Sequence, residues 1–363
     1  MKIQVTQENL NKALSSVARV ASSRNTLPIL ANVLIKTVGT RLSISATNLD
    51  IAITHFIGSK VSEEGSITIP ARLVQDFVSS LPSGIIELKL DEYKLHFSTG
   101  TYRSTINGIS SEEFPVLPSI KDGQEWKIDS SLLKKKLQQV IIAASNDDTR
   151  PVLTGVYFHS DQGKLLIVAT DSYRLAEATV MNTDQTINIL VPFSATQELL
   201  RLASDFDGEI EVTHNDQQVL FRVGDVELVA RLIDGKYPNY ASLIPKKFIT
   251  TARLPKSELL NIAKVSSLFA RENAGSITLE VNDQDQTLNI HSIASQLGEN
   301  IASTTGKIKG EGSITLNSRY LLDALHAMTG EEIVFSFNGK LEPSLLKDPS
   351  DVDYIHVIMP LKS

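Results

Sequence analysis

The chain has 363 residues, of which 42% are hydrophobic and 21% charged, and its net charge is −7. This composition is typical of a globular protein, and the lack of cysteine excludes disulfides, thiolate metal sites and a cysteine nucleophile. The opening residues lack the apolar core of a signal peptide and no apolar run is long enough to span a bilayer, so we expect a cytoplasmic protein.

The first third of the chain reads as two successive units, each a strand, a helix and three strands. A strand at Ile3 and Val5 leads into an amphipathic helix through Leu10, Leu14 and Val17. After Gly65 the pattern restarts with a strand and a helix that begins near Pro70. The other strands are expected near residues 33–35, 42–46, 51–56, 86–90, 95–98 and 102–106.

A short apolar strand that runs into a helix start occurs three times, at residues 67–73, 189–195 and 314–320. Pro70 and Pro192 fit the first turn of a helix, and Asn317 is a favourable N-cap. These three positions lie 122 and 125 residues apart, which is the size of a domain. The chain therefore reads as three copies of one α+β fold.

The middle third repeats the first at a constant offset of 123 residues. Seven identities share this register; examples are Leu10 with Leu133, Pro28 with Pro151, and Ala46-Thr47 with Ala169-Thr170. The last third has diverged further. We expect three domains with short linkers, over residues 1–122, 123–247 and 248–363.

We find no set of residues that indicates catalysis, a metal or a cofactor. The seven histidines are scattered without metal-ligand spacing, and the glycines form no phosphate loop. A hydrolase with a site in a domain cleft would need a catalytic set that the sequence does not supply. The sequence predicts a binding protein, and a protein-interaction scaffold without a DNA role is the main alternative.

Two features suggest binding surfaces. Basic residues lie on or beside the expected helices, and repeat symmetry would place the outer helix faces on one surface; an ordinary solvated face is the simpler reading of each residue alone. The segment 169–176, Ala-Thr-Asp-Ser-Tyr-Arg-Leu-Ala, gains a Tyr-Arg-Leu that its duplicate at 46–51 lacks. We interpret it as a binding segment, against the alternative of a simple polar turn.

Five motifs together resemble the bacterial DNA polymerase III β subunit family, the sliding clamps, over essentially the whole chain. They lie at residues 26–30, 149–155, 169–176, 234–240 and 357–361. The resemblance implies a non-catalytic head-to-tail homodimer that closes as a ring of six domains around duplex DNA, without sequence specificity. It also implies tethering of the polymerase, opening by a clamp loader, and other partners with a clamp-binding peptide motif.

By position, the resemblance implies a peptide pocket between the second and third domains. Its residues are Leu153, Thr170, Ser172, Tyr173, Arg174, Leu175, Pro238, Leu243, Pro343, Val357, Met359, Pro360 and Leu361. We expect DNA to face Arg24, Arg72, Lys134, Lys135, Lys136 and Arg201. The dimer interface is expected at the extended edges 102–107 and 299–303, with Arg103, Ile106, Leu268, Phe269 and Glu299. Ser172-Tyr173 and Ser242 depart from the Gly-His and the basic residue that the family often has.

Overall fold

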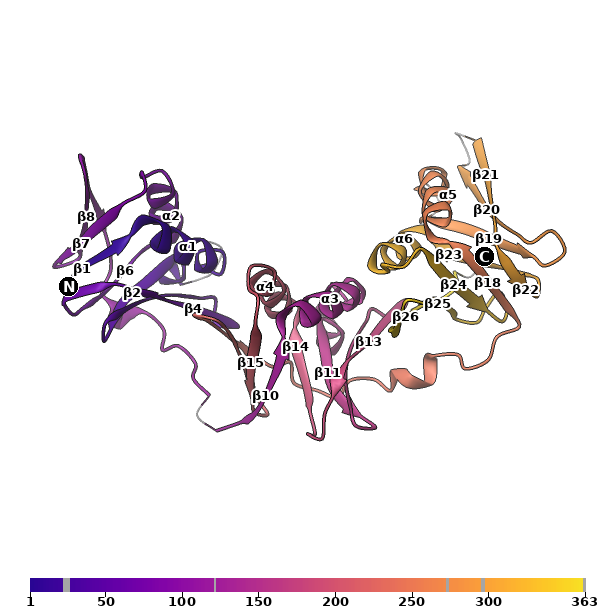
Figure 1. Ribbon diagram of the computed structural model, residues 1–363, viewed down its shortest axis with the longest axis horizontal. Helices are drawn as coiled ribbons and strands as arrows, with labels where there is room; N and C mark the ends of the chain where they lie inside the picture. Colours follow the sequence, from indigo (N-terminus) through magenta and orange to yellow (C-terminus); the bar gives the residue numbers. More distant parts are fainter. Residues whose placement is uncertain (22–26, 121, 272–273, 295–297, 362–363) are drawn as a thin grey trace. The chain divides into compact units, whose positions relative to one another are not determined.

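The structure is a computed structural model that describes residues 1–21, 27–120, 122–271, 274–294 and 298–361 (Figure 1). It contains two compact units that divide the central third of the chain between them. The first unit comprises residues 1–131 and 197–232, and the second comprises residues 132–196 and 233–363. Each unit is described separately below.

The first unit contains two antiparallel sheets in the described part of the chain. The five-stranded sheet has the order β5-β1-β7-β8-β9, with bounds Lys60–Glu63, Lys2–Thr6, Ile85–Asp91, Lys94–Thr99 and Tyr102–Asn107. The eight-stranded sheet has the order β10-β15-β16-β17-β4-β3-β2-β6. Its bounds are Gln124–Asp129, Glu209–His214, Gln218–Val223, Val226–Arg231, Ile51–Gly58, Arg41–Thr47, Asn32–Val38 and Ser66–Pro70.

The second unit likewise contains two sheets among its described residues. The nine-stranded sheet has the order β14-β11-β12-β13-β26-β25-β24-β18-β22. Its bounds are Asn188–Pro192, Gly155–Asp161, Lys164–Thr170, Arg174–Asn182, Asp351–Ile358, Ser344–Asp348, Glu332–Phe337, Thr250–Pro255 and Lys307–Lys309. The four-stranded sheet has the order β21-β20-β19-β23, with bounds Gly298–Thr305, Thr287–Ala294, Ser276–Asn282 and Gly312–Asn317.

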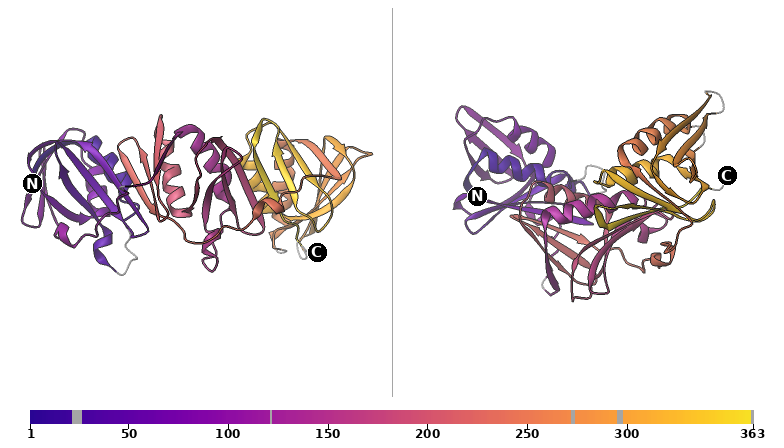
Figure 2. Two further views of the ribbon diagram at one scale, coloured as in Figure 1. Left: turned by 90° about the horizontal axis from the view of Figure 1, so that it is seen from below. Right: turned by 45° about the vertical axis from the view of Figure 1, so that its right-hand side comes forward.

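The helices pack on these sheets through apolar faces, as their amphipathic sequences predict. In the first unit, α1 (Gln7–Val17) and α2 (Ala71–Ser79) lie side by side, with Leu10, Leu14 and Val74 fully buried. In the second unit, α5 (Lys256–Phe269) and α6 (Ser318–Ala327) form a similar pair, visible in orange and yellow in Figures 1 and 2. The remaining helices are α3 (Ser130–Val140) and α4 (Phe193–Ser204).

The strand-to-helix stretch occurs at all three predicted places, as β6–α2, β14–α4 and β23–α6. Asn317 is the predicted N-cap, and its side-chain oxygen accepts from the backbone N–H groups of Arg319 and Tyr320. Pro70 and Pro192 differ slightly from the prediction, because each ends its strand just before the helix begins instead of entering the first turn of the helix. The fold class of repeated α+β units is confirmed.

The larger sheets join strands from both sides of an expected domain boundary. In the first unit, β17 of the middle third pairs with β4 of the first third, with Leu228 opposite Ile53. In the second unit, β13 pairs with β26 of the last third, with Leu175 opposite Val357. The boundaries after residues 122 and 247 remain predictions. None of the described helices is long and apolar enough to cross a membrane.

Candidate functional site: an apolar pocket beside strand β26

The second unit contains a cavity of about 470 Å³, which is within the usual size of a ligand pocket. It opens where the start of β13 and the end of β26 meet the chain segment 236–243. Its lining is mainly apolar and consists of Arg150, Val152, Leu153, Thr170, Ser172, Arg174, Leu175, Lys236, Pro238, Tyr240, Leu243, Val357 and Met359.

Nine of the thirteen pocket residues expected from the sequence line this cavity. They come from four stretches of chain: Leu153; Thr170, Ser172, Arg174 and Leu175; Pro238 and Leu243; and Val357 and Met359. Because these stretches are far apart in the sequence, only the fold brings them together. The floor of the cavity is part of the hydrophobic core, because Leu153, Leu175 and Val357 belong to the buried core of this unit.

Four expected residues do not line the cavity. Tyr173 is 57% exposed, and its carbonyl accepts from the Met359 N–H at 2.8 Å. Pro360 and Leu361 follow β26, and the Leu361 N–H donates to the carbonyl of Thr315 at 2.8 Å. Pro343 is half-buried just before β25. These residues hold or flank the pocket strand instead.

Four lining residues were missed from the sequence: Arg150, Val152, Lys236 and Tyr240. All four lie in or beside the motifs at 149–155 and 234–240, so membership of a motif was the available signal. The sequence could not show which motif residues face the cavity. The short helix η4 (Pro151–Leu153) turns Val152 and Leu153 toward it, and η5 (Tyr240–Leu243) does the same for Tyr240 and Leu243.

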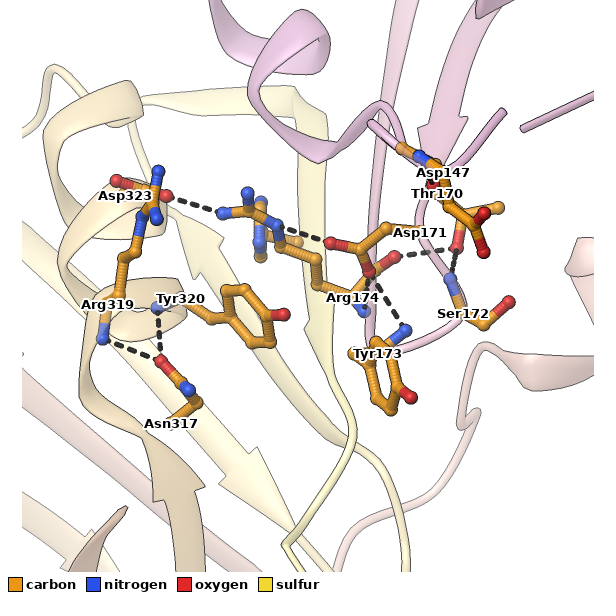
Figure 3. A network of polar contacts seen from close by, with 12 residues as sticks. Asp147, Thr170, Asp171, Ser172, Tyr173, Arg174, Asn317, Arg319, Tyr320 and Asp323 are labelled. Carbon is orange, nitrogen blue, oxygen red and sulfur yellow. Dashed lines mark hydrogen bonds and ion pairs between the residues drawn. The ribbon is translucent and has the colours of Figure 1, made fainter. Parts of the chain in front are cut away.

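The turn before β13 is fixed by its own side chains (Figure 3). Thr170 Oγ1 donates to the Arg174 carbonyl at 2.6 Å, and Asp171 Oδ1 accepts from the N–H groups of Tyr173 and Arg174 at 2.9 Å each. Ser172 adopts a φ of 76°, in the left-handed region that favours glycine. The tight turn therefore does not require the glycine that the family often has there.

Arg174 is buried, and its guanidinium is occupied within the protein (Figure 3). Its Nε donates to Asp171 Oδ2 at 3.2 Å and its Nη1 donates to Asp323 Oδ2 at 2.6 Å. The guanidinium carbon also lies 4.4 Å from the centre of the Tyr320 ring. Arg174 therefore lines the cavity and also ties the turn to helix α6.

The charged residues that line the cavity are all cations, and acids outside the lining pair with two of them. Three lining residues are cations, and no Asp or Glu is among the lining residues. Two acids neutralise Arg174, and Arg150 pairs with Asp147 at 3.4 Å and donates to Ser172 Oγ at 2.9 Å. An apolar pocket whose charged lining residues are all cations suits a short peptide that has large apolar side chains and no excess of positive charge.

The expectation that Lys136 faces DNA is wrong, because its side chain is buried. Its Nζ lies 2.8 Å from Asp351 Oδ1, and Lys135 Nζ lies 2.8 Å from Asp351 Oδ2. Burial would raise the pKa of Asp351, but hydrogen bonds from Lys135, Lys136 and Gln139 outweigh it and hold that pKa well below its ordinary value. Lys136 therefore joins α3 to the start of β26.

The other residues expected to face DNA differ in how exposed their side chains are and in whether they are paired. Arg72 is exposed, Lys135 is exposed despite its ion pair, and Lys134 is half-buried. Arg201 is half-buried; it pairs with Glu198 at 2.8 Å and donates to the carbonyl of Ser16 at 2.8 Å. Arg24 lies outside the described residues.

The expected interface strands are both sheet edges: β9 ends the five-stranded sheet and β21 ends the four-stranded sheet. Arg103 and Glu299 are exposed, Leu268 is 53% exposed and Phe269 is half-buried. The expectation that Ile106 contributes to the dimer interface is wrong, because its side chain is buried inside the first unit and is not available to a partner.

Comparison with known proteins identifies the family. Family models of the DNA polymerase III beta subunit match the N-terminal domain at residues 1–118, the central domain at 127–239 and the C-terminal domain at 241–362. The beta sliding clamp of Bacillus subtilis is 31% identical over the full length of both chains. That of Synechococcus elongatus is 32% identical over 100% of this chain and 99% of its own.

Solved structures agree with these relatives. The sliding clamp of Bacillus subtilis superposes with a TM-score of 0.96 at 30% identity, covering 100% of this chain and 99% of the other. The sliding clamp of Pseudomonas aeruginosa, solved bound to griselimycin, gives a TM-score of 0.95 at 26% identity with both chains fully covered. The chain therefore consists of three clamp domains and belongs to the DNA polymerase III beta subunit family, the beta sliding clamps.

Proposed function

We propose that two copies of this chain join head to tail into a ring that encircles duplex DNA and holds the replicative polymerase through the pocket beside β26. The observation that carries this proposal is the cavity itself, which gathers nine of the residues that the family resemblance assigns to partner binding. The clamp loader and other proteins with a clamp-binding peptide would use the same pocket. The subunit itself is proposed to be non-catalytic and to need no cofactor; a cytoplasmic location remains a prediction.

A closed ring explains how an acidic protein can serve DNA. The net charge of −7 opposes strong binding to phosphates, and each neutralised phosphate would add affinity and salt dependence that hinder sliding. A ring stays on DNA by topology and needs only a weakly positive lining. Arg72, Lys134 and Lys135 are the described candidates for that lining.

Retention on circular DNA tests the ring directly. The chain is loaded by a clamp loader onto nicked circular DNA and isolated by gel filtration, and half of the sample is then linearised. We expect the protein to stay on the circle and leave the linear form. Equal retention on both forms would defeat the ring and would favour a protein-interaction scaffold or simple DNA binding.

The exposed edges support the proposed dimer. An edge strand presents unpaired backbone groups that a second sheet can satisfy, and β9 and β21 are two such edges. Exposed apolar side chains also lie on α5 and β21, which pack together: Val265, Leu268 and Ile301. Leu268→Ala combined with Phe269→Ala should convert the dimer to monomer in sedimentation. An unchanged mass would place the interface elsewhere.

The lining is tested by charge reversal. Arg24, Arg72 and Lys134 replaced by Glu should weaken DNA loading, with the largest effect at low salt. Lys135 and Lys136 stay unchanged, because both pair with Asp351. Normal loading of this variant would assign the lining to other residues.

Truncation tests the pocket. Loss of residues 359–363 removes Met359, a flexible apolar side chain suited to varied ligands. We expect a labelled peptide that contains one Gln, two Leu and one Phe to bind the full chain with a Kd of about 1 μM. The truncated chain should lose this binding and processive synthesis but remain a dimer. Unfolding would mean that these residues are structural, and normal binding would mean that the pocket is misplaced.

A further inference from the structure

One wall of the pocket rests on a closed set of four aromatic rings. Tyr157 and His159 lie on β11, and Tyr237 and Tyr240 lie on the segment that forms the wall. Tyr157 stacks on His159 and on Tyr237, with ring centres 4.6 Å apart in each case. Tyr240 meets His159 edge-on at 5.7 Å and Tyr237 at 6.3 Å. The rings therefore join the wall to the sheet.

A polar link runs through the hydroxyl of Tyr240. His159 Nε2 lies 2.7 Å from Tyr240 Oη. Glu177 on β13 is the acidic neighbour of the same hydroxyl, and its interaction with Tyr240 lowers the pKa of Glu177 against the effect of burial. Because a tyrosine has one hydroxyl proton, the consistent arrangement is His159 Nε2–H donating to Tyr240 and Tyr240 donating to Glu177. Burial raises the pKa of Glu177 and lowers that of His159, so the link sits where water competes poorly.

Tyr240 faces the cavity, whereas His159 and Glu177 do not line it. The backbone N–H groups of Tyr240 and Ile244 bond within the segment, to the carbonyls of Pro238 and Ala241. The side chain of Tyr240 thus carries a bond from this wall to the strands. Four lining residues share the wall: Lys236, Pro238, Tyr240 and Leu243.

We propose that His159 and Glu177 are positioning residues of the pocket, which hold Tyr240 and with it the wall 236–243 in the geometry that the peptide needs. This inference rests on the proposed peptide-binding function. It separates two roles of Tyr240: the ring closes the cavity, and the hydroxyl fixes where the ring lies.

The test uses the full-length dimer and two measurements. The first is the Kd of the fluorescein-labelled Gln/Leu/Phe peptide, and the second is hydrogen exchange of residues 236–243 without peptide. Tyr240→Phe keeps the ring and removes the hydroxyl, so we expect about fivefold weaker binding and about fivefold faster exchange. Tyr157→Phe is the matched control, because its hydroxyl bonds Asn188 instead, and it should change neither value.

Conservative variants separate positioning from general stability. Glu177→Gln keeps an acceptor for the tyrosine proton and should stay within about twofold of wild type, whereas Glu177→Leu should resemble Tyr240→Phe. His159→Phe added to Tyr240→Phe should weaken binding no further than Tyr240→Phe alone, because Tyr240→Phe has already removed the bond to His159.

The outcomes are distinguishable. Wild-type affinity and exchange in Tyr240→Phe would overturn the inference, as would equal weakening by Tyr157→Phe. If the wild-type chain does not bind the peptide at all, the proposed ligand is wrong. The exchange comparison then still decides whether the Tyr240 hydroxyl holds the wall.

Discussion

The turns at residues 47–51 and 170–174 are duplicates with the same backbone and different side chains. Thr47 and Thr170 each donate to the carbonyl four residues on, at 2.9 and 2.6 Å. Asn48 and Asp171 each accept from the N–H groups two and three residues later. Leu49 and Ser172 adopt φ values of 78° and 76°.

The same correspondence holds for the strands that pair with these turns. The Arg231 N–H donates to the Asp50 carbonyl at 3.0 Å, and the Met359 N–H donates to the Tyr173 carbonyl at 2.8 Å. The backbone scaffold of the pocket therefore exists in both copies. The difference lies in a few side chains, chiefly Arg174 in place of Ile51 and Met359 in place of Arg231.

The helix acids differ in the same way. In the repeat of the strand-to-helix stretch, Asp323 corresponds to Glu198. Glu198 pairs with Arg201 on its own helix at 2.8 Å, whereas Asp323 reaches Arg174 on another element at 2.6 Å. The Arg174–Asp323 pair thus links the turn at residues 170–174 to α6, and the same turn lines the pocket.

The largest expected effect comes from Arg174→Ile, which gives the pocket turn the residue of its duplicate. Asp171 and Asp323 would lose their cation, and removal of one partner from a buried pair costs about 3 kcal/mol. Urea unfolding of the second unit measures this. Adding Asp171→Asn, the residue at position 48 of the duplicate, with Asp323→Asn should recover part of the loss. A cost below about 1 kcal/mol would show that Arg174 contributes little to stability.

Met359→Arg makes the matching exchange at the strand. Arg231 is exposed in the first unit, so this residue type is compatible with the paired backbone. In the pocket it would add a fourth cation to an apolar cavity. We expect peptide affinity to fall about 30-fold, or about 2 kcal/mol, without loss of the dimer. Met359→Leu is the control and should stay within about threefold. Unchanged affinity in the arginine variant would remove Met359 from the binding surface.

Thr170→Val and Thr47→Val test whether the threonine hydroxyl stabilises the two turns equally. Each loses the hydroxyl that donates to a carbonyl and accepts from an N–H. We expect each to lower the free energy of unfolding by about 1 kcal/mol. Thr→Ser at either position should restore most of it. A much larger cost at Thr170 alone would mean that the pocket copy depends on this bond more than its duplicate does.

The smallest expected change in stability concerns Leu49 and Ser172, whose φ values lie in the left-handed region. Ser172→Gly and Leu49→Gly relieve a backbone cost of about 1 kcal/mol, partly offset by the larger entropy of glycine in the unfolded chain. Each should stabilise the protein by about 0.5 kcal/mol. Thermal melting measures the gain, and Tyr173→Gly, outside that region, serves as the contrast. Destabilisation of both variants would show that the side chains at these positions matter more than the backbone.

The sequence by itself determined the repeat, the strand-to-helix stretches and the Asn317 cap, because these depend on local periodicity and on caps within a few residues. It also placed most of the pocket, since the resemblance covers every motif that contributes a lining residue. The sequence was also enough to show that Lys134, Lys135 and Lys136 cannot all face DNA. Consecutive residues on a helix are turned by about 100° from one another and cannot all face the same way.

Only the tertiary structure decided which side chains were available. Arg174 finds Asp323 across 149 residues of sequence, and Lys136 finds Asp351 across 215. The pairing of β13 with β26 brings the binding segment to the end of the chain, and the ring set carries Tyr240 into the pocket wall. Burial and pairing of charged groups depend on which elements meet, and no local pattern records that choice.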